Sequence, residues 1–338
     1  MSQLEATRPA APEALTTAVV MCTYNGERFL QAQLDSLLAQ TRLPGQIVIR
    51  DDLSSDGTLA ILEAFAAQAR ARGIAVDLAR NAHNLGYRRN FESALASAGA
   101  QVLFLCDQDD VWHPRRIERF MAEFEQRPEL ALLHCDARLV DADGAPLGTS
   151  LFQALGVSRA ELDGMHAGDA FAILLRRNLV TGAACAIRAR LLAPAMPFPA
   201  EGWSHDEWIA MVAAFTERLD TLEEPLLDYR QHDANQMGAR KTTLVQRWLG
   251  IGLERQAYIA AMVRRLQQLA DHVQARGIGK VAQRTELQAR LAHARFRSNL
   301  PASLVARWRG IGRELSLGHY RRYGSGARSL IADLLDLS

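Results

Sequence analysis

Three aspartates within four residues stand out in the segment "FLCDQDDVWHP": Asp107, Asp109 and Asp110. They follow directly on the run "QVLFLC", whose apolar character is typical of a buried strand. Carboxylates this close raise one another's pKa unless a cation compensates their charge. Two interpretations are open: a solvated loop in which Asp110 caps the next helix, or a site for Mg²⁺ or Mn²⁺, which prefer carboxylate oxygen.

Other polar clusters also follow short apolar runs. "CTYNGE", "DDLSSDG" and "NAHNLG" stand at 22–27, 51–57 and 81–86, each after a predicted strand. Helical patterns follow them at 26–41, 54–73 and 84–99, and another follows the aspartates at 113–126. This alternation predicts βαβ units on a mostly parallel sheet flanked by helices. Because ligands of such sheets bind at the carboxyl ends of the strands, we expect the four clusters to form one site.

The rest of the chain departs from this alternation. Residues 131–235 carry a hairpin signal, "DADG", and several prolines, whereas apolar residues recur at helical steps after about residue 240. We therefore expect an α/β class with a helical C-terminal extension. The predicted division is a disordered lead at 1–16, a catalytic domain at 17–238 with halves 17–130 and 131–238, and a basic helical region at 239–338.

Charge is unevenly distributed along the 338 residues. The chain carries a formal net charge of +1, but residues 236–338 hold 18 arginines and lysines against 6 acidic residues. The remainder is therefore acidic, at about −11. An acidic body with a basic C-terminal region suggests cation binding in the first and contact with an anionic surface in the second.

Cysteine spacing and hydropathy indicate the compartment. Cys22, Cys106, Cys135 and Cys185 form no C-x-x-C pair and no zinc spacing, so we expect packed thiols in a reducing environment. The lead has no basic segment followed by an apolar one, and no apolar run approaches the roughly 18 residues of a membrane span. These features favour a cytoplasmic protein.

The segments "VVMCTYNGERFLQAQLDSLLAQT", "VIRDDLSSDGT", "NLGYRRNFESAL" and "LCDQDDVWHPRRI", in this order, resemble glycosyltransferase family 2. Members of this family use nucleotide sugars and have the GT-A fold, and the resemblance covers roughly residues 17–235. Within the family, "TGAACAIRARLL", "HDEW" and "YRQHDANQMG" look most like bacterial rhamnosyltransferases, which take rhamnose from dTDP-rhamnose.

The resemblance assigns roles to the polar clusters. It implies that Asp107 and Asp109 hold Mg²⁺ or Mn²⁺ on the nucleotide diphosphate and that His232 completes the metal shell, although a lone histidine is also common in loops and cores. Asp52 matches the residue that accepts the N–H of the pyrimidine ring; alternatively it bonds to the adjacent turn. The implied nucleotide-sugar contacts are Thr23, Tyr24, Asn25, Glu27, Asp52, Asn84, Gly86, Asn90, Asp107 and Gly182.

For catalysis, the resemblance implies that Asp206, in the pair His205-Asp206, removes the proton from the acceptor. Glu207 is a competitor for this role, and capping of the following helix is the structural alternative for Asp206. Arg88 and Arg89 are placed where they could pair with phosphate, or they face solvent.

The implied function is inverting, metal-dependent transfer of rhamnose to a saccharide acceptor of a cell-surface glycan, such as lipopolysaccharide O-antigen. A transferase of the same family that uses UDP-glucose, UDP-galactose or UDP-N-acetylglucosamine is an alternative, as is a non-catalytic nucleotide-sugar-binding scaffold. A nucleotidyltransferase would need a Gly-rich, Arg- or Lys-bearing loop where this chain has "TYNGERFL".

Aromatic residues and arginines alternate in the basic C-terminal region, where Trp248, Tyr258, Phe296 and Trp308 stand among ten arginines. Such helices suit the anionic inner face of the plasma membrane, where a lipid-linked saccharide acceptor would lie. Packing on the acidic body or formation of a homo-oligomer are alternatives. Charge alone would also suit a nucleic acid, but no nucleic-acid-binding motif supports that interpretation, so none is expected as a partner.

Overall fold

The computed structural model describes residues 14–233, 253–324 and 326–334, so most of the predicted lead at 1–16 lies outside the described residues. The strands are β1 (Thr17–Thr23), β2 (Gln46–Asp51), β3 (Ala75–Arg80), β4 (Val102–Cys106), β5 (Val111–Trp112), β6 (Leu130–Val140), β7 (Pro146–Ser150), β8 (Cys185–Arg188) and β9 (Arg218–Arg230). The α-helices are α1 (Glu27–Leu38), α2 (Thr58–Ala71), α3 (Tyr87–Ala96), α4 (Arg116–Gln126), α5 (Leu151–Ala154), α6 (Arg159–Ala167), α7 (Ala170–Arg176), α8 (Leu192–Ala195), α9 (His205–Thr216), α11 (Leu253–Arg276), α12 (Val281–Ser298), α13 (Leu304–Ser316), α14 (His319–Tyr323) and α15 (Ala327–Leu334).

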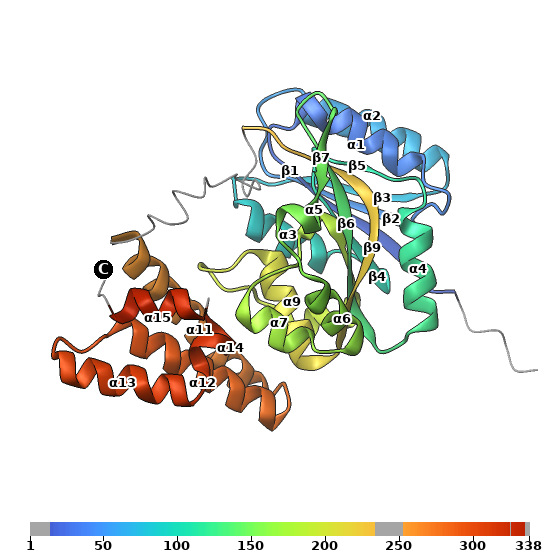
Figure 1. Cartoon of the computed structure of the whole chain (residues 1–338). Coiled ribbons are helices and arrows are strands. Elements are labelled where there is room, and N and C mark those ends of the chain that lie inside the picture. The colour runs from blue at the N-terminus through green and yellow to red at the C-terminus, as the bar shows by residue number, and fades with distance from the viewer. Residues whose placement is uncertain (1–13, 234–252, 325, 335–338) are drawn as a thin grey trace, which may run out of the picture.

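One nine-stranded sheet forms the centre of the molecule, with the order β3-β2-β1-β4-β8-β6-β9-β5 and β7 paired to β6 (Figure 1). The strands β3, β2, β1 and β4 are parallel, as the alternation predicts. Beyond β4 the sheet is mixed, because β8 runs antiparallel to both β4 and β6, and β5 runs antiparallel to β9. The α/β class is confirmed, and its parallel part is concentrated in the first half of the chain.

Side chains of β1 show how the sheet is buried on both faces. Val19 and Met21 pack with residues of α1, α2 and α4, whereas Ala18 and Val20 pack on the other face with residues of α3, α7 and α9. A strand covered on both faces reads as a continuous apolar run, which explains the pattern "TAVVMCT". The carboxyl ends of the parallel strands therefore lie at one edge, between two layers of helices.

The C-terminal helices pack on the side of the sheet that carries α7 and α9. Leu269, Val273 and Leu287 share a hydrophobic core with Trp208 and Phe215 of α9. Packing on the acidic body, one of the alternatives for this region, is therefore observed (Figure 1). The predicted boundary at 238/239 lies outside the described residues, so the domain limits stay a prediction.

Among the described helices, none has the length and apolar character needed to cross a membrane.

Candidate active site

The loop that follows β4 is fastened to the turn that follows β1. Gln108 makes two bonds to the backbone of Tyr24: its Oε1 accepts from the Tyr24 N–H at 2.8 Å, and its Nε2 donates to the Tyr24 carbonyl at 3.1 Å. Gly26 leaves room for this amide, because a Cβ there would lie 2.4 Å from Gln108 Oε1. The middle residue of the D-x-D segment thus fixes the two aspartates relative to the first strand.

Asp109 and His232 meet at this edge from segments far apart in the sequence. The Asp109 Oδ2 and His232 Nε2 atoms are 2.8 Å apart. Asp107 is partly buried beside them, and its pKa is raised to about 7 by burial and by the nearby carboxylates of Asp109 and Asp206. The structure therefore gathers the three predicted metal ligands and the predicted base at one edge of the sheet.

This donor set suits a divalent cation. Among the described residues, no hydrogen-bond donor to the Asp107 carboxylate is found, and burial and the neighbouring carboxylates raise its pKa to about 7. Two carboxylates and an imidazole are ligands that Mg²⁺ or Mn²⁺ accepts, with positions left for phosphate oxygens. We conclude that Asp107, Asp109 and His232 fit the metal that the family resemblance implies.

Asp110 does not cap the next helix, which was the structural alternative for this residue. Its side chain is 1% exposed, and its Oδ1 accepts the Arg230 N–H at 3.0 Å, whereas α4 begins only at Arg116. The same arginine donates from Nε to the Asp109 carbonyl at 2.8 Å. Asp110 and Arg230 therefore hold the end of β9 against the acidic loop, which places His232 beside Asp109.

A buried arginine lies behind the acidic loop. Arg116 is 0% exposed, donates to the Ala183 carbonyl at 2.6 Å, and stacks 4.0 Å from the centroid of the Trp112 ring. Its charge lowers the pKa of Asp107, but less than burial and Asp109 raise it. Sequence reasoning missed this residue, because an arginine in the first turn of an amphipathic helix reads as a surface residue.

Asp206 lies in the first turn of α9 and faces the turn that contains Gly182. Its Oδ2 accepts the Gly182 N–H at 2.8 Å. A Cβ at position 182 would approach His205 Nε2 to 2.9 Å, so only glycine allows this close contact. His205 itself is buried and stacks on Phe91, with ring centroids 4.1 Å apart. The other oxygen, Oδ1, accepts the Glu207 N–H at 2.9 Å, so both oxygens of the carboxylate are held.

The turn after β1 is locked to the segment after β2. The Asn25 side-chain oxygen accepts the Ser55 N–H at 2.8 Å, and the Glu27 carboxylate accepts the Gly57 N–H at 2.8 Å. Asn25 has φ of 48°, in the left-handed region that asparagine tolerates better than most residues. Tyr24, Asn25 and Glu27 remain exposed at the crevice, which keeps them available to a donor.

Asp52 holds the third loop in place. Its carboxylate accepts bonds from Asn81 Nδ2 at 2.7 Å and from the N–H groups of Leu85 and Gly86, both at 2.8 Å. Asn84 adds a bond to the Asp52 carbonyl at 3.2 Å. The turn-bonding alternative is therefore present in the structure, and the base-reading role of Asp52 stays a prediction.

Two predicted donor contacts are buried and engaged elsewhere. Asn90 is 1% exposed, donates to the Arg50 carbonyl at 2.9 Å and accepts from Asn81. Thr23 is 2% exposed and donates to the Asp51 carboxylate at 3.0 Å. Their side chains support the loops from below, and direct contact with a donor stays a prediction for both. Sequence pattern could not separate these support residues from the exposed ones.

Arg88 and Arg89 also have protein partners. Arg88 donates to the carbonyls of Ala200 and Trp203, and Arg89 pairs with Glu92. The phosphate-pairing role is therefore not what the structure shows for either arginine. Arg88 joins α3 to the segment that leads into α9.

Glu207, the competitor of Asp206, is occupied by the C-terminal region. Its Oε2 accepts from Arg265 of α11 at 2.8 Å, and the same guanidinium lies 4.2 Å from the centroid of the Trp203 ring. Because the Glu207 carboxylate is engaged by this guanidinium, Asp206 is the better candidate for the base.

Residues 18–181 match the family model described as "Glycosyl transferase family 2". The chain carries a glycosyltransferase family 2 domain. The enzyme class expected from the sequence, a glycosyltransferase, is thereby confirmed.

Three curated relatives are similar over parts of the chain. An uncharacterised glycosyltransferase of Nostoc sp. is 27% identical over 68% of this chain and 69% of its own length. An uncharacterised protein of Mycobacterium tuberculosis is 31% identical over 38% of this chain and 37% of its own length. The dTDP-rhamnosyl transferase RfbG of Shigella flexneri is 33% identical over 29% of this chain and 34% of its own length. The chain therefore spans only about a third of the last two.

Solved structures share the fold at low identity. Staphylococcus aureus TarS (residues 1–349), in complex with UDP-GlcNAc, superposes with a TM-score of 0.57 and 17% identity, over 96% of this chain and 90% of that one. The mannosyltransferase PcManGT of Pyrobaculum calidifontis, in complex with GDP-Man and Mn²⁺, gives a TM-score of 0.52 and 18% identity, over 96% and 88%. These likenesses confirm the GT-A type of fold.

Proposed function

We propose that this glycosyltransferase moves rhamnose from dTDP-rhamnose, with inversion, to a hydroxyl of a saccharide acceptor in a cell-surface glycan of the O-antigen type. The observation that carries the reaction type is the Asp206 carboxylate, held by the Gly182 N–H in the same crevice as Asp107 and Asp109. A carboxylate opposite a diphosphate site is what direct displacement requires, because the acceptor loses its proton as the diphosphate leaves.

Each group has a defined task in this proposal. Asp206 accepts the proton of the acceptor hydroxyl, and the Gly182 N–H keeps the carboxylate aimed at it. Asp107, Asp109 and His232 hold the cation, which when bound offsets the negative charge that grows on the leaving diphosphate. Tyr24, Asn25, Glu27, Asn84 and Gly86 line the donor side, with Asp52 as the base-reading residue.

The identity of the donor sugar is the part of the proposal with the least support. Rhamnose is favoured by the 33% identity to the dTDP-rhamnosyl transferase RfbG, and a UDP-sugar by the fold shared with the TarS complex, which holds UDP-GlcNAc. A non-catalytic nucleotide-sugar scaffold would retain the metal ligands but would have no reason to retain the Asp206 contact.

A calorimetric titration with dTDP-rhamnose, UDP-glucose, UDP-galactose and UDP-N-acetylglucosamine tests the proposal, each with Mn²⁺ and with a chelator. We expect tight binding of dTDP-rhamnose in the presence of Mn²⁺ and much weaker binding with the chelator. Preference for a UDP-sugar would exclude dTDP-rhamnose as the donor and would leave the enzyme class unchanged. Binding of no donor under either condition would contradict the proposal.

A further inference from the structure

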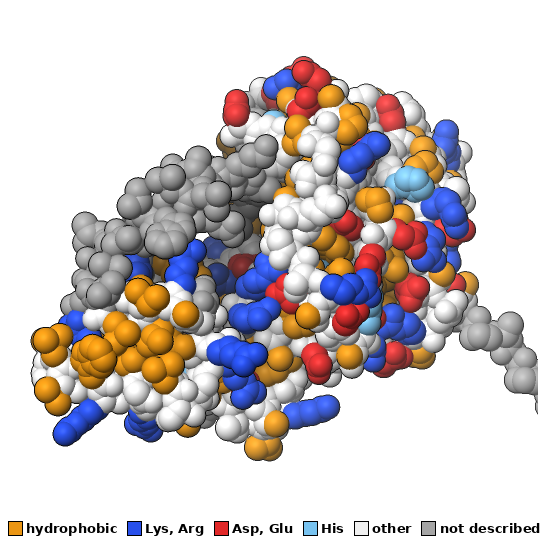
Figure 2. Space-filling model, in the orientation of Figure 1, with side chains coloured by type: hydrophobic (Ala, Val, Ile, Leu, Met, Phe, Trp, Pro, Cys, Tyr) orange, Lys and Arg blue, Asp and Glu red, His pale blue; other side chains and the backbone are white. Residues whose placement is uncertain are grey.

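A stripe of large apolar side chains faces solvent on α13. Leu304 and Val305 are each 64% exposed, Trp308 is 60% exposed and Leu315 is 45% exposed. Leu304, Trp308 and Leu315 stand at i, i+4 and i+11, which places them on one side of a helix. Figure 2 shows hydrophobic side chains gathered over this part of the C-terminal region. Leu317 and Ile331, each 52% exposed, add to the apolar surface of the same helical region.

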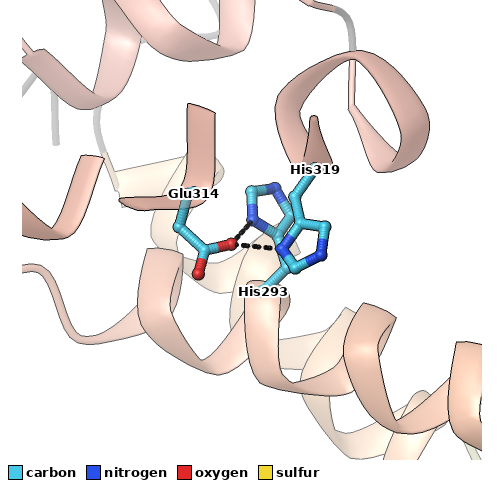
Figure 3. Close-up of side chains that lie close together, drawn as sticks. All are labelled: His293, Glu314 and His319. Atoms are coloured by element: carbon cyan, nitrogen blue, oxygen red, sulfur yellow. Dashed lines mark hydrogen bonds and ion pairs between the residues drawn. The ribbon is translucent and has the colours of Figure 1, made fainter. Parts of the chain in front are cut away.

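The side of α13 next to the stripe is buried against its neighbours, so the stripe cannot turn inward. Ile311 is buried, and Glu314 Oε2 lies 2.6 Å from His293 Nδ1 of α12 and 2.8 Å from His319 Nδ1 of α14 (Figure 3). Burial lowers the pKa of His293 to about 4, so its imidazole is neutral and donates to the carboxylate. These contacts set the rotation of α13 about its own axis.

The same His293, Glu314 and His319 side chains form a group of metal-capable residues among those the structure describes. Both imidazole nitrogens already lie at hydrogen-bond distance from a single carboxylate oxygen. Because the Nδ1 atoms of both histidines contact the Glu314 carboxylate, the cluster is explained as the link between three helices, and we assign no metal to it.

The charge around the stripe is of one sign. Residues 304–334 contain two acidic side chains, Glu314 and Asp333, and both are buried. Asp333 accepts bonds from Arg297 at 2.9 Å and from the Tyr320 hydroxyl at 2.8 Å. The exposed charged side chains of α13, α14 and α15 are therefore all arginines: Arg309, Arg313, Arg321, Arg322 and Arg328.

We propose that this face of α13, the stripe with its flanking arginines, docks the protein on the anionic surface of a membrane. Apolar side chains of such a helix enter the boundary between headgroups and acyl chains, and arginines beside them pair with lipid phosphates. A second copy of this chain fits less well, because it would bring two sets of exposed arginines together. The proposal extends the proposed function, since it brings the site to a lipid-linked acceptor.

Vesicle flotation of the full chain tests this proposal. We compare vesicles of phosphatidylcholine alone with vesicles of phosphatidylcholine and phosphatidylglycerol in equal amounts. The variants are Leu304→Ser/Trp308→Ser, which removes apolar contacts, and Arg309→Gln/Arg313→Gln, which removes charge. Leu147→Ser, at a 48% exposed residue of β7, is the matched control. None of these positions belongs to the catalytic site, so donor binding should be unchanged in all of them.

We expect wild type and the control to bind the anionic vesicles, and each α13 double variant to lose at least about tenfold in partitioning. Raising the ionic strength toward about 1 M should also weaken binding of the wild type to the anionic vesicles, because salt screens the attraction between arginines and lipid phosphates. The proposal is overturned if wild type floats with neither vesicle, if the double variants bind like wild type, or if the stripe variants only convert a dimer to a monomer in sedimentation. Vesicle binding without donor binding would refute the proposed function and leave this inference standing.

Discussion

Replacement of Asp206 by asparagine tests the proposed base with little change in shape. The carboxylate accepts two backbone bonds, from the Gly182 N–H at 2.8 Å and from the Glu207 N–H at 2.9 Å. Asparagine has one acceptor oxygen and keeps only one of them. The loss of one such charge-assisted bond costs about 1.5–3 kcal/mol of stability, which the fold should tolerate.

The effect on turnover should be far larger. A positioned general base contributes about 10²–10⁴-fold to rate, which corresponds to about 3–5 kcal/mol of barrier. We therefore expect Asp206→Asn to retain Mn²⁺-dependent donor affinity and to lose at least about a hundredfold in kcat. The lost backbone bond lowers the stability of the fold, and thermal unfolding of the variant measures that effect separately.

Release of nucleoside diphosphate from the donor identified by titration provides the assay. Water can take the place of the acceptor hydroxyl, so slow donor hydrolysis reports on the same base before the natural acceptor is known. Glu207→Gln is the matched control: it removes the adjacent carboxylate, which Arg265 already engages, and should change kcat only severalfold. Asp206→Asn turnover within tenfold of wild type, or a greater loss in Glu207→Gln, would refute the assignment.

Four further predictions concern the cation and the loops around it. Asp109→Asn should abolish the Mn²⁺ dependence of donor affinity in calorimetry; unchanged dependence would count against the metal site. The metal-free pKa of Asp107, about 7, lies above the ordinary value of about 3.9, so this group favours the folded state less as pH rises from about 4 to 7. The increase in Tm on adding Mn²⁺ should accordingly grow from pH 5.5 to about 7.5, and a flat profile would contradict this reasoning. Gly182→Ala places a Cβ 2.9 Å from the confined His205 ring and should cost about 1–3 kcal/mol in thermal unfolding, together with most of the turnover; wild-type kcat would argue against a fixed carboxylate. Asp52→Asn should lose one charge-assisted loop bond, about 1.5–3 kcal/mol, whereas weaker nucleotide binding at an unchanged Tm would favour base reading alone.

The first half of the sheet and the position of the polar clusters at its edge could be predicted, because local sequence patterns determine them. Each strand from β1 to β4 is an apolar run that ends at a polar cluster, and parallel pairing brings those ends to one edge. The order β8-β6-β9-β5 could not be predicted, because antiparallel insertion of β8 between β4 and β6 depends on long-range contacts that leave no periodic signal.

Roles within the clusters were harder to predict than their location. Asn84 and Asn90 stand in one polar segment, yet the first is exposed and the second supports the loops from beneath. The Gln108 amide makes two hydrogen bonds to the backbone of Tyr24, 84 residues away, and nothing in the local sequence around Gln108 indicates them. Such assignments depend on which side chain points inward at an irregular turn, and residue type does not determine that.

The C-terminal arginines show why net charge alone was a poor guide to the surface. Arg255 and Arg297 pair with the buried Asp333, and Arg265 pairs with Glu207, so much of the excess positive charge lies inside the molecule. The contact at Glu207 is one residue from Asp206. The C-terminal helical region therefore has two proposed tasks. Arg265 of α11 supports the turn that carries Asp206, and α13 presents the face proposed to dock on a membrane.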